Sequence, residues 1–363
     1  MHQARVTHVL DNLDKLGLSQ MLINDPLAIF WLTGYYTEPY ERFFGLYLSQ
    51  NSEPIMFCNR LFPDASSACD KVITFTDTDN PIALVAEACD HTAPLGIDRT
   101  LNAGWLLPLM DSGAAQSYRL GSPAVDAARS IKDADECDAM RRASQINDQA
   151  MDWLASQLHE GVTEREIAEG LLGEYRRLGA DGFSFSPIVS FGANAADPHH
   201  EPDDTQLVAG EMALFDVGCK LDAYCSDMTR TFWFAGKEGK EPDELSRRVY
   251  ETVRAANEAA ERIIAPGITF AEIDHAARSV IEDAGWGPNF THRLGHQIGL
   301  KEHEPGDVSA SHNEPVQPGQ IFSIEPGIYL EGSIGVRIED LVIVTDDGCE
   351  IINSYPKELT IVR

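Results

Sequence analysis

Basic residues, paired cysteines and long apolar runs are all scarce in this chain of 363 residues. Lys and Arg number 28 against 58 Asp and Glu, which gives a formal net charge of −30 at pH 7. Nucleic acid and anionic membrane surfaces would repel a chain this acidic that has no basic cluster. We therefore expect neither nucleic acid nor a membrane as a partner, and we interpret the charge as a source of solubility.

Cysteine is sparse and shows no paired spacing. The seven cysteines are odd in number and form no C-x-x-C motif, which favours reduced, mostly buried thiols over a disulfide framework or a zinc site. No apolar run approaches the ~20 residues of a membrane span. The first residues lead into a polar helix and not into the apolar segment of a signal peptide. These absences predict a soluble, cytoplasmic protein.

The length of the chain favours two domains. Residues 1–125 alternate short strands with helices and include a hairpin at residues 44–59, which predicts a small α/β layer domain. Beyond this stretch the pattern lapses, and Asp133 opens a long amphipathic helix with acids in its first turn. We place the domain boundary at this point, so that the second domain comprises residues 126–363.

The second domain contains an internal repeat. Residues 161–167 (GVTEREI) resemble residues 267–273 (GITFAEI). Each copy continues through a stretch rich in Gly and His into an apolar strand, at residues 210–218 and 319–327. A sequence repeat of this kind indicates a structural repeat, with two similar halves folded against each other.

Four acids and one histidine form a candidate metal site. Aligned on their first glycines, the two strands place Asp216 and Glu325 at the same position, and a second acid, Asp227 or Glu339, follows each. Four carboxylates brought to one centre cannot all stay ionised unless cations lie among them. His296, between two glycines, adds an imidazole. Such a mainly oxygen site suits two divalent ions, Mn²⁺ foremost and Zn²⁺, Co²⁺ or Fe²⁺ as alternatives.

This constellation resembles a known family. The series Asp216, Asp227, His296, Glu325 and Glu339, each in its local motif, is similar to the metallopeptidases that include methionine aminopeptidase, aminopeptidase P and Xaa-Pro dipeptidase. The resemblance covers roughly residues 133–363 and implies the "pita-bread" α/β fold with an internal pseudo-twofold. Residues 31–35 (WLTGY) and 38–42 (EPYER) resemble the N-terminal domain of short bacterial Xaa-Pro dipeptidases, the prolidases.

The resemblance also implies a role for each ligand. Asp216 would bind one ion, and His296 and Glu325 would bind the other. Asp227 and Glu339 would bridge both ions. Glu325 would in addition be catalytic, because it is placed to take a proton from water and to relay it to the proline nitrogen.

Further residues match substrate-contacting positions of the family. The catalytic candidates are His199, His292 and His303, and the candidates for substrate binding are Arg293, Arg337, Glu41 and Arg42. His200 competes with its neighbour His199, although strand alternation would aim it away. The segment of Glu41 and Arg42 would approach the active site of a second subunit in a homodimer. One departure from the family is Gln297 in place of a glycine, which predicts a narrower pocket wall.

The expected activity is hydrolysis of Xaa-Pro dipeptides, small peptides with a C-terminal proline. The bond to proline offers no N–H group. A dinuclear centre would instead polarise the carbonyl and supply a bridging hydroxide, while His292 and His303 bind the oxyanion. Arg337 would hold the substrate carboxylate, unless it pairs with Asp340 or another acid. The alternatives are an aminopeptidase P that acts on longer peptides, a non-peptidase hydrolase or lyase, and an inactive binding module.

Overall fold

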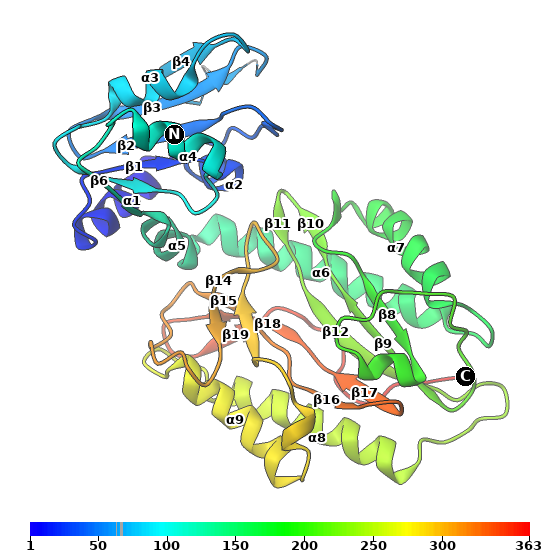
Figure 1. Cartoon of the computed structure of the whole chain (residues 1–363). Coiled ribbons are helices and arrows are strands. Elements are labelled where there is room, and N and C mark those ends of the chain that lie inside the picture. Colours follow the sequence, from blue (N-terminus) through cyan, green and yellow to red (C-terminus); the bar gives the residue numbers. More distant parts are fainter. Residues whose placement is uncertain (63, 66–67) are drawn as a thin grey trace. The chain divides into compact units, whose positions relative to one another are not determined.

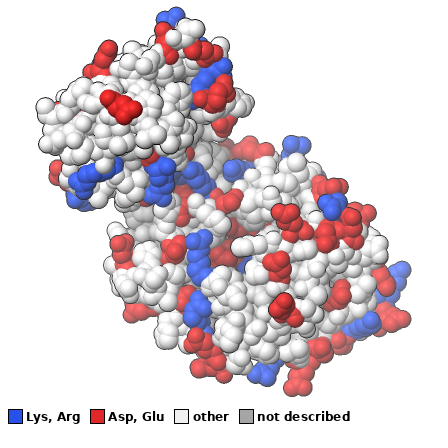
Figure 2. All heavy atoms as spheres, in the orientation of Figure 1, with Lys and Arg blue, Asp and Glu red and all other residues white. Residues whose placement is uncertain are grey.

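The computed structural model describes residues 1–62, 64–65 and 68–363, which divide into two compact units, Met1–Arg129 and Ser130–Arg363 (Figure 1). The division falls within helix α5 (Ser122–Ser130), whereas the sequence placed it after residue 125. No helix in the described part of the chain is long and apolar enough to cross a membrane. Figure 2 shows acidic side chains spread over the visible face of both units, with Lys and Arg interspersed.

The N-terminal unit is the mixed α/β domain that the sequence predicts. Its six-stranded sheet has the order β4-β3-β2-β1-β5-β6, in which β1–β2 and β2–β3 are antiparallel and the other pairs parallel. The strands are β1 (Gln20–Ile23), β2 (Gly45–Ser49), β3 (Ser52–Asn59), β4 (Lys71–Phe75), β5 (Pro94–Ile97) and β6 (Ser117–Leu120). The helices before α5 are α1 (Gln3–Lys15), α2 (Pro26–Thr33), α3 (Pro81–Ala88) and α4 (Ala103–Asp111).

The C-terminal unit begins with the first copy of the repeat. Its elements are α6 (Ala134–Gln157), α7 (Glu164–Leu178), β7 (Gly182–Phe183), β8 (Ile188–Phe191), the 3-10 helix η2 (Gly192–Ala196), β9 (Glu211–Val217), β10 (Cys219–Leu221), β11 (Tyr224–Cys225) and β12 (Met228–Phe234). β8, β9 and β12 form one antiparallel sheet, to which β20 (Ile361–Val362) adds in parallel. Helices α6 and α7 pack on this sheet through a shared apolar core.

The second copy repeats the arrangement. Its elements are α8 (Glu244–Ile263), α9 (Phe270–Asp283), the 3-10 helix η3 (Gly287–Asn289), β13 (Gly295–Gln297), β14 (Glu304–Val308), β15 (Ile321–Ile324), β16 (Gly327–Leu330), β17 (Ile334–Arg337), β18 (Asp340–Val344) and β19 (Cys349–Ile351). The sheet order is β14-β13-β15-β18-β19, and β16 and β17 form a separate hairpin. Figure 1 shows the strands of this unit between the α6–α7 pair and the α8–α9 pair.

Local sequence explains why the copies match. Thr163 and Thr269 each cap a helix, α7 or α9, and each forms a capping box with a glutamate three residues later. Each threonine also forms an isolated antiparallel bridge, to Gln206 in the first copy and to Pro315 in the second. The predicted internal repeat is therefore a repeat of backbone structure.

Buried asparagines connect each copy's first helix to a site-bearing strand. Asn147 Nδ2 in α6 donates to the Val217 carbonyl at 2.8 Å, and Asn257 Nδ2 in α8 donates to the Ile324 carbonyl at 2.9 Å. Because both carbonyls belong to residues next to candidate ligands, the two helices hold the strand ends at which the site forms. All seven cysteines are unpaired, and six of them are buried.

Candidate metal centre

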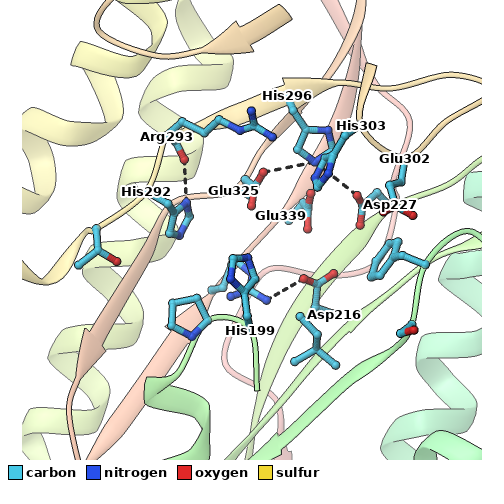
Figure 3. A pocket seen from close by; sticks show the side chains of 16 residues that line it. His199, Asp216, Asp227, His292, Arg293, His296, Glu302, His303, Glu325 and Glu339 are labelled. Atoms are coloured by element: carbon cyan, nitrogen blue, oxygen red, sulfur yellow. Dashed lines mark hydrogen bonds and ion pairs between the residues drawn. The ribbon is translucent and has the colours of Figure 1, made fainter. Parts of the chain in front are cut away.

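The five candidate ligands lie in or next to strands from both copies and line one pocket of about 800 Å³ (Figure 3). Asp216 belongs to β9, and Asp227 directly precedes β12. His296 belongs to β13, Glu325 follows β15, and Glu339 lies between β17 and β18. Residues spread over more than a third of the chain are thus brought to one centre.

Strand register brings the acids together. Thr229 lies opposite Asp216 in the β9–β12 pair, so Asp227, two residues earlier, points to the same face as Thr229. The β15–β18 register opposes Ile324 and Asp340, which places the neighbouring Glu325 and Glu339 across from each other. A hydrogen bond of 3.1 Å from the Glu339 amide to the Thr229 carbonyl joins the two copies at this point.

Strands β13 and β15 lie so close together that the residue before His296 must be a glycine. A Cβ atom at Gly295 would lie 1.9 Å from the Ser323 carbonyl oxygen, so only glycine fits. His296 Nε2 lies 3.6 Å from Asp227 Oδ2 and 3.4 Å from Glu325 Oε1. Ligand atoms of Asp227, His296 and Glu339 all lie within 4.8 Å of one another, and these three residues are buried.

The charges of this cluster are not balanced by the protein alone. Burial, with neighbouring carboxylates adding to it, raises the pKa of Asp227 and of Glu339 well above the ordinary range. Burial likewise raises the pKa of Glu325 to about 7, although Arg337 opposes this shift. Burial lowers the pKa of His296 to about 3, with His303 acting in the same direction, so its imidazole is neutral and can bind a metal.

Two buried oxygen atoms support a cation at this place. Asp216 Oδ1 and Asp227 Oδ1 are buried and have no hydrogen-bond partner. Unpaired carboxylate oxygens are costly to bury unless something positive pairs with them. Together with the neutral His296 imidazole, they form a donor set that fits divalent metal ions.

Arg337 is engaged by protein groups inside the pocket. Its Nη2 donates to Asp216 Oδ2 at 2.7 Å, its Nη1 to the Tyr329 hydroxyl at 2.8 Å, and its Nε to Thr229 Oγ1 at 3.1 Å. The ion pair that the sequence left open as an alternative is thus present, with Asp216 and not with Asp340 as the partner. Arg337 also lines the pocket.

Tyr329 extends this network to a histidine. Its hydroxyl lies 2.9 Å from His292 Nε2, and His292 Nδ1 lies 2.7 Å from the Arg293 carbonyl. Because the carbonyl can only accept, Nδ1 carries the proton and Nε2 accepts from Tyr329. Burial lowers the pKa of His292 to about 4. No motif in the sequence marks Tyr329. Its place follows from the β16–β17 register, which opposes Tyr329 to Gly335 and so leaves Tyr329 diagonal to Arg337.

Two further candidate histidines lie in the pocket wall. His199, just after η2, lines the pocket, and His303 does so with its ring edge-on to His296 at a centroid distance of 4.1 Å. His200 is not among the lining residues. Its Nε2 lies 2.7 Å from Glu164 Oε2. The segment of His199 is a turn and not a strand, so the side chains of His199 and His200 are separated by the local direction of the chain and not by strand alternation.

Gln297, which stands where the family usually has a glycine, does not narrow the pocket. His296 points into the site, and the next side chain in the strand, Gln297, packs against Gly306 on β14. A Cβ atom at Gly306 would lie 2.6 Å from Gln297 Nε2, so the glycine makes room for the glutamine. The expectation of a narrower wall was therefore wrong, because alternation along β13 turns Gln297 out of the pocket.

The remaining substrate-binding candidates lie in different surroundings. Arg293 lines the pocket and donates to Asp307 Oδ1 at 2.7 Å. Glu41 and Arg42 belong to the N-terminal unit, between α2 and β2, where Arg42 forms ion pairs with Glu41 at 2.8 Å and with Asp77 at 2.9 Å. Glu302, the neighbour of His303, also lines the pocket, although no motif in the sequence marks it.

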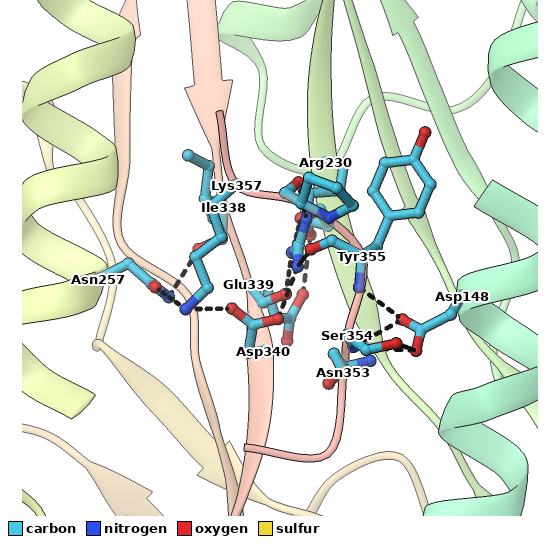
Figure 4. Close-up of polar contacts among 12 residues, drawn as sticks. Asp148, Arg230, Asn257, Ile338, Glu339, Asp340, Asn353, Ser354, Tyr355 and Lys357 are labelled. Carbon is cyan, nitrogen blue, oxygen red and sulfur yellow. Dashed lines mark hydrogen bonds and ion pairs between the residues drawn. The ribbon is translucent and has the colours of Figure 1, made fainter. Parts of the chain in front are cut away.

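A buried ionic network lies behind Glu339 (Figure 4). Arg230 donates to the Glu339 carbonyl at 2.7 Å and to Asp340 Oδ1 at 2.7 Å. Lys357 reaches Asp340 at 2.8 Å and Glu261 at 2.6 Å. Burial tends to raise the pKa of Asp340, but Arg230 and Lys357 outweigh it and lower the pKa. The network therefore holds the backbone that carries the candidate ligand Glu339.

A duplicated α/β domain that gathers four acids and a histidine in one pocket defines a metal-dependent hydrolase. Residues 138–346 match metallopeptidase family M24, and residues 5–131 match the creatinase/prolidase N-terminal domain. The chain belongs to metallopeptidase family M24. Its pita-bread fold with an N-terminal α/β domain agrees with this membership.

Whole-length relatives share this architecture. An uncharacterized peptidase from Staphylococcus aureus is 35% identical over 356 residues, which cover 97% of this chain and 99% of the relative. The crystal structure of a prolidase from Thermococcus sibiricus matches with a TM-score of 0.92 at 33% identity, over 99% of both chains. A dipeptidase from Mycobacterium ulcerans matches with a TM-score of 0.92 at 31% identity, over 99% of this chain and 98% of that one.

Proposed function

We propose that the protein is an Xaa-Pro dipeptidase that uses two divalent metal ions, Mn²⁺ foremost, to hydrolyse dipeptides with a C-terminal proline. The observation that carries this proposal is a set of four acids, two buried and two partly buried, beside a buried neutral histidine, in a pocket that also holds three histidines and two arginines. The prolidase and dipeptidase names of similar whole-length structures support it.

The five ligands would share the ions between them. Asp216 would hold one ion, His296 and Glu325 the other, and Asp227 and Glu339 would contribute to both. The orphaned oxygens of Asp216 and Asp227 support a cation beside these two acids. Bound ions would polarise the scissile carbonyl and lower the pKa of a water molecule at the centre.

The chain's own groups would then move the protons. Glu325, whose carboxylate lies 3.4 Å from the His296 ring at the centre, is placed to accept the proton of the attacking water and to return it to the proline nitrogen. His199 and His303, from opposite copies, would bind the substrate and its developing oxyanion. His292, which was expected to bind the oxyanion with His303, has both ring nitrogens engaged, by the Tyr329 hydroxyl and the Arg293 carbonyl, so it would complete this wall of the pocket and not bind the oxyanion.

The metal and the substrate length can be tested together. The protein would be stripped with a chelator, reloaded with Mn²⁺, and assayed on Leu-Pro and on Leu-Pro-Gly. Loss of hydrolysis on stripping, recovery on reloading and a preference for the dipeptide are expected. A preference for the tripeptide would indicate aminopeptidase P instead. A metal-loaded protein that cleaves neither peptide would favour a non-peptidase activity or a binding module.

Arg337 and Arg293 are the proposed partners of the substrate carboxylate. Arg337 is the rigid donor of the pocket, but it already pairs with Asp216, so its two possible roles need separation. Arg337→Lys should lower kcat/KM on Leu-Pro by at least ~10-fold, the effect of one lost charged hydrogen bond. A smaller loss on the amidated dipeptide would support carboxylate binding. Equal losses would show that Arg337 acts only through Asp216, and Arg293 would then be the carboxylate partner.

We further propose a cytoplasmic homodimer in which Glu41 and Arg42 contribute to a second subunit's site. The seven unpaired cysteines favour a reducing compartment. Arg42→Ala and Glu41→Ala should change KM for Leu-Pro without loss of bound metal. Light scattering would give the mass of the assembly. A monomer whose variants behave as wild type would contradict this proposal.

A further inference from the structure

Glu302 is an acid of the pocket that stands apart from the ligand set. It lines the pocket and is partly buried. Within the described ranges, no side chain makes a hydrogen bond or an ion pair with its carboxylate. Lys220 on β10 influences it electrostatically without forming an ion pair. A carboxylate that is partly removed from water and unpaired has a free-energy cost that an incoming cation would offset.

The charges of the pocket are distributed unevenly. Figure 3 shows Glu302 on the Asp227 side of the acid cluster, and His292 and Arg293 on the opposite side. A dipeptide that spans the centre would direct its C-terminal carboxylate to the side of Arg293. Its first residue would then extend toward Glu302.

We propose that Glu302 selects dipeptides whose first residue is cationic, such as Lys-Pro and Arg-Pro, an inference that rests on the proposed Xaa-Pro dipeptidase function. The substrate's ammonium or guanidinium group pairs with the Glu302 carboxylate. The pocket also contains Phe185 and Ile188, whose apolar surfaces suit the methylene stem of Lys or Arg.

The environment of Glu302 agrees with this role. Burial raises the pKa of its carboxyl group, and Asp216 adds to the shift while Lys220 opposes it. The carboxylate is therefore ionised more easily when a positive group of the substrate lies beside it. A neutral first residue gains no such interaction and leaves the carboxylate unpaired.

The test compares two substrates of similar shape, Lys-Pro and norleucyl-proline, on the metal-loaded protein. The wild type should show a higher kcat/KM on Lys-Pro. Glu302→Gln should lower kcat/KM on Lys-Pro by roughly 10-fold, as expected for one charged hydrogen bond, and should leave norleucyl-proline within about twofold. Glu302→Lys should shift the preference toward Glu-Pro. Glu331→Gln, the same charge change at an exposed residue outside the pocket lining, is the matched control and should change neither substrate.

Three outcomes would overturn the inference. One is a wild type that shows no preference between the two substrates. The second is an equal fall on both substrates in Glu302→Gln, since Glu302 would then bind the α-ammonium group that both share. The third is a Glu302→Gln variant that keeps the preference. Failure of the proposed function looks different, because the metal-loaded wild type would hydrolyse neither dipeptide, and the inference would fall with it. Metal content, measured for each variant, separates loss of selectivity from loss of ions.

Discussion

The two copies of the repeat have matching backbone contacts at the start of their second helices. They differ in how the neighbouring loops are held, by hydrogen bonds to a carboxylate in the first copy and by aromatic packing in the second. The Gly161 amide donates to the Leu207 carbonyl in the first copy, and the Gly267 amide donates to the Val316 carbonyl in the second. The residue after the threonine cap is Glu164 in one copy and Phe270 in the other. The repeated backbone therefore leaves this side chain free to differ.

In the first copy the loop is held by a buried carboxylate. Glu164 is fully buried and accepts hydrogen bonds from the Phe191 amide at 2.7 Å and the Asp203 amide at 3.1 Å. It also contacts Asn194 and His200. This network holds the segment that carries His199 into the pocket.

In the second copy an aromatic residue occupies the same place. Phe270 stacks on His312 with a centroid distance of 4.3 Å and an interplanar angle of 20°, and meets Phe322 edge-on at 5.2 Å. It belongs to the large apolar core under α8 and α9. The loop beside Phe270 is held by apolar burial, whereas the loop that carries the candidate residue His199 is held by directional hydrogen bonds.

The largest expected effect comes from the pair of acids that the repeat makes equivalent. Asp216→Asn and Glu325→Gln should each lower kcat/KM on Leu-Pro by roughly 10³-fold, because each removes a proposed ligand and Glu325 is in addition the proposed base. Kinetics and elemental analysis of bound metal would be measured on both variants. If either variant kept its metal and most of its activity, the two acids would not be functional equivalents.

The next effect would sharpen the contrast between Glu164 and Phe270. Phe270→Ala should reduce the free energy of unfolding by ~3–5 kcal/mol through the cavity it leaves, with little change in kcat/KM for the protein that remains folded. Glu164→Gln should cost only ~1–3 kcal/mol in lost hydrogen bonds. It should nevertheless lower kcat/KM by roughly 10-fold, because the His199 segment loses its anchor. Chemical denaturation and steady-state kinetics would be compared, and the opposite pattern of losses would contradict the division of roles.

The smallest expected effect concerns three acids of the cluster, Asp227, Glu325 and Glu339. The pKa values of His292 and His296 are lowered in the folded protein, so these two histidines make the protein more stable as the pH rises. This gain ends near pH 6.5, the ordinary pKa of histidine, because the histidines of the unfolded chain have then lost their protons as well. Burial raises the pKa of Glu325 to about 7 and the pKa values of Asp227 and Glu339 well above their ordinary range, so near neutral pH the folded, metal-free protein holds protons that the unfolded chain has lost. Its stability should therefore fall as the pH rises above 6.5.

Thermal unfolding of the chelator-treated protein across a pH series would measure this fall in stability. Metal-loaded protein is the control. Because bound cations keep the acids ionised, its Tm should not fall as the pH rises above 6.5. A metal-free protein whose Tm rises with pH above 6.5 would show that the acids are not held together in the folded state.

Local spacing determined much of what the sequence predicted. The capping boxes at Thr163 and Thr269, the alternation of β9 and the equivalence of Asp216 and Glu325 all depend on residues within one element or on one repeat. Helix caps and strand alternation are physical properties of short segments, so they can be read without a fold. The N-terminal α/β domain followed from the same kind of pattern, and the pita-bread fold followed from the family resemblance.

Only the tertiary structure decided which distant groups meet. Arg337 pairs with Asp216, 121 residues away, and Arg230 pairs with Asp340, 110 residues away. Tyr329 joins His292 to Arg337 through strand pairing, and Glu302 enters the pocket through the packing of its loop. No spacing in the sequence encodes such contacts, because each depends on how two sheets approach. The sequence by itself determined which side chains could form a metal site, and the packing of the two copies decided their partners.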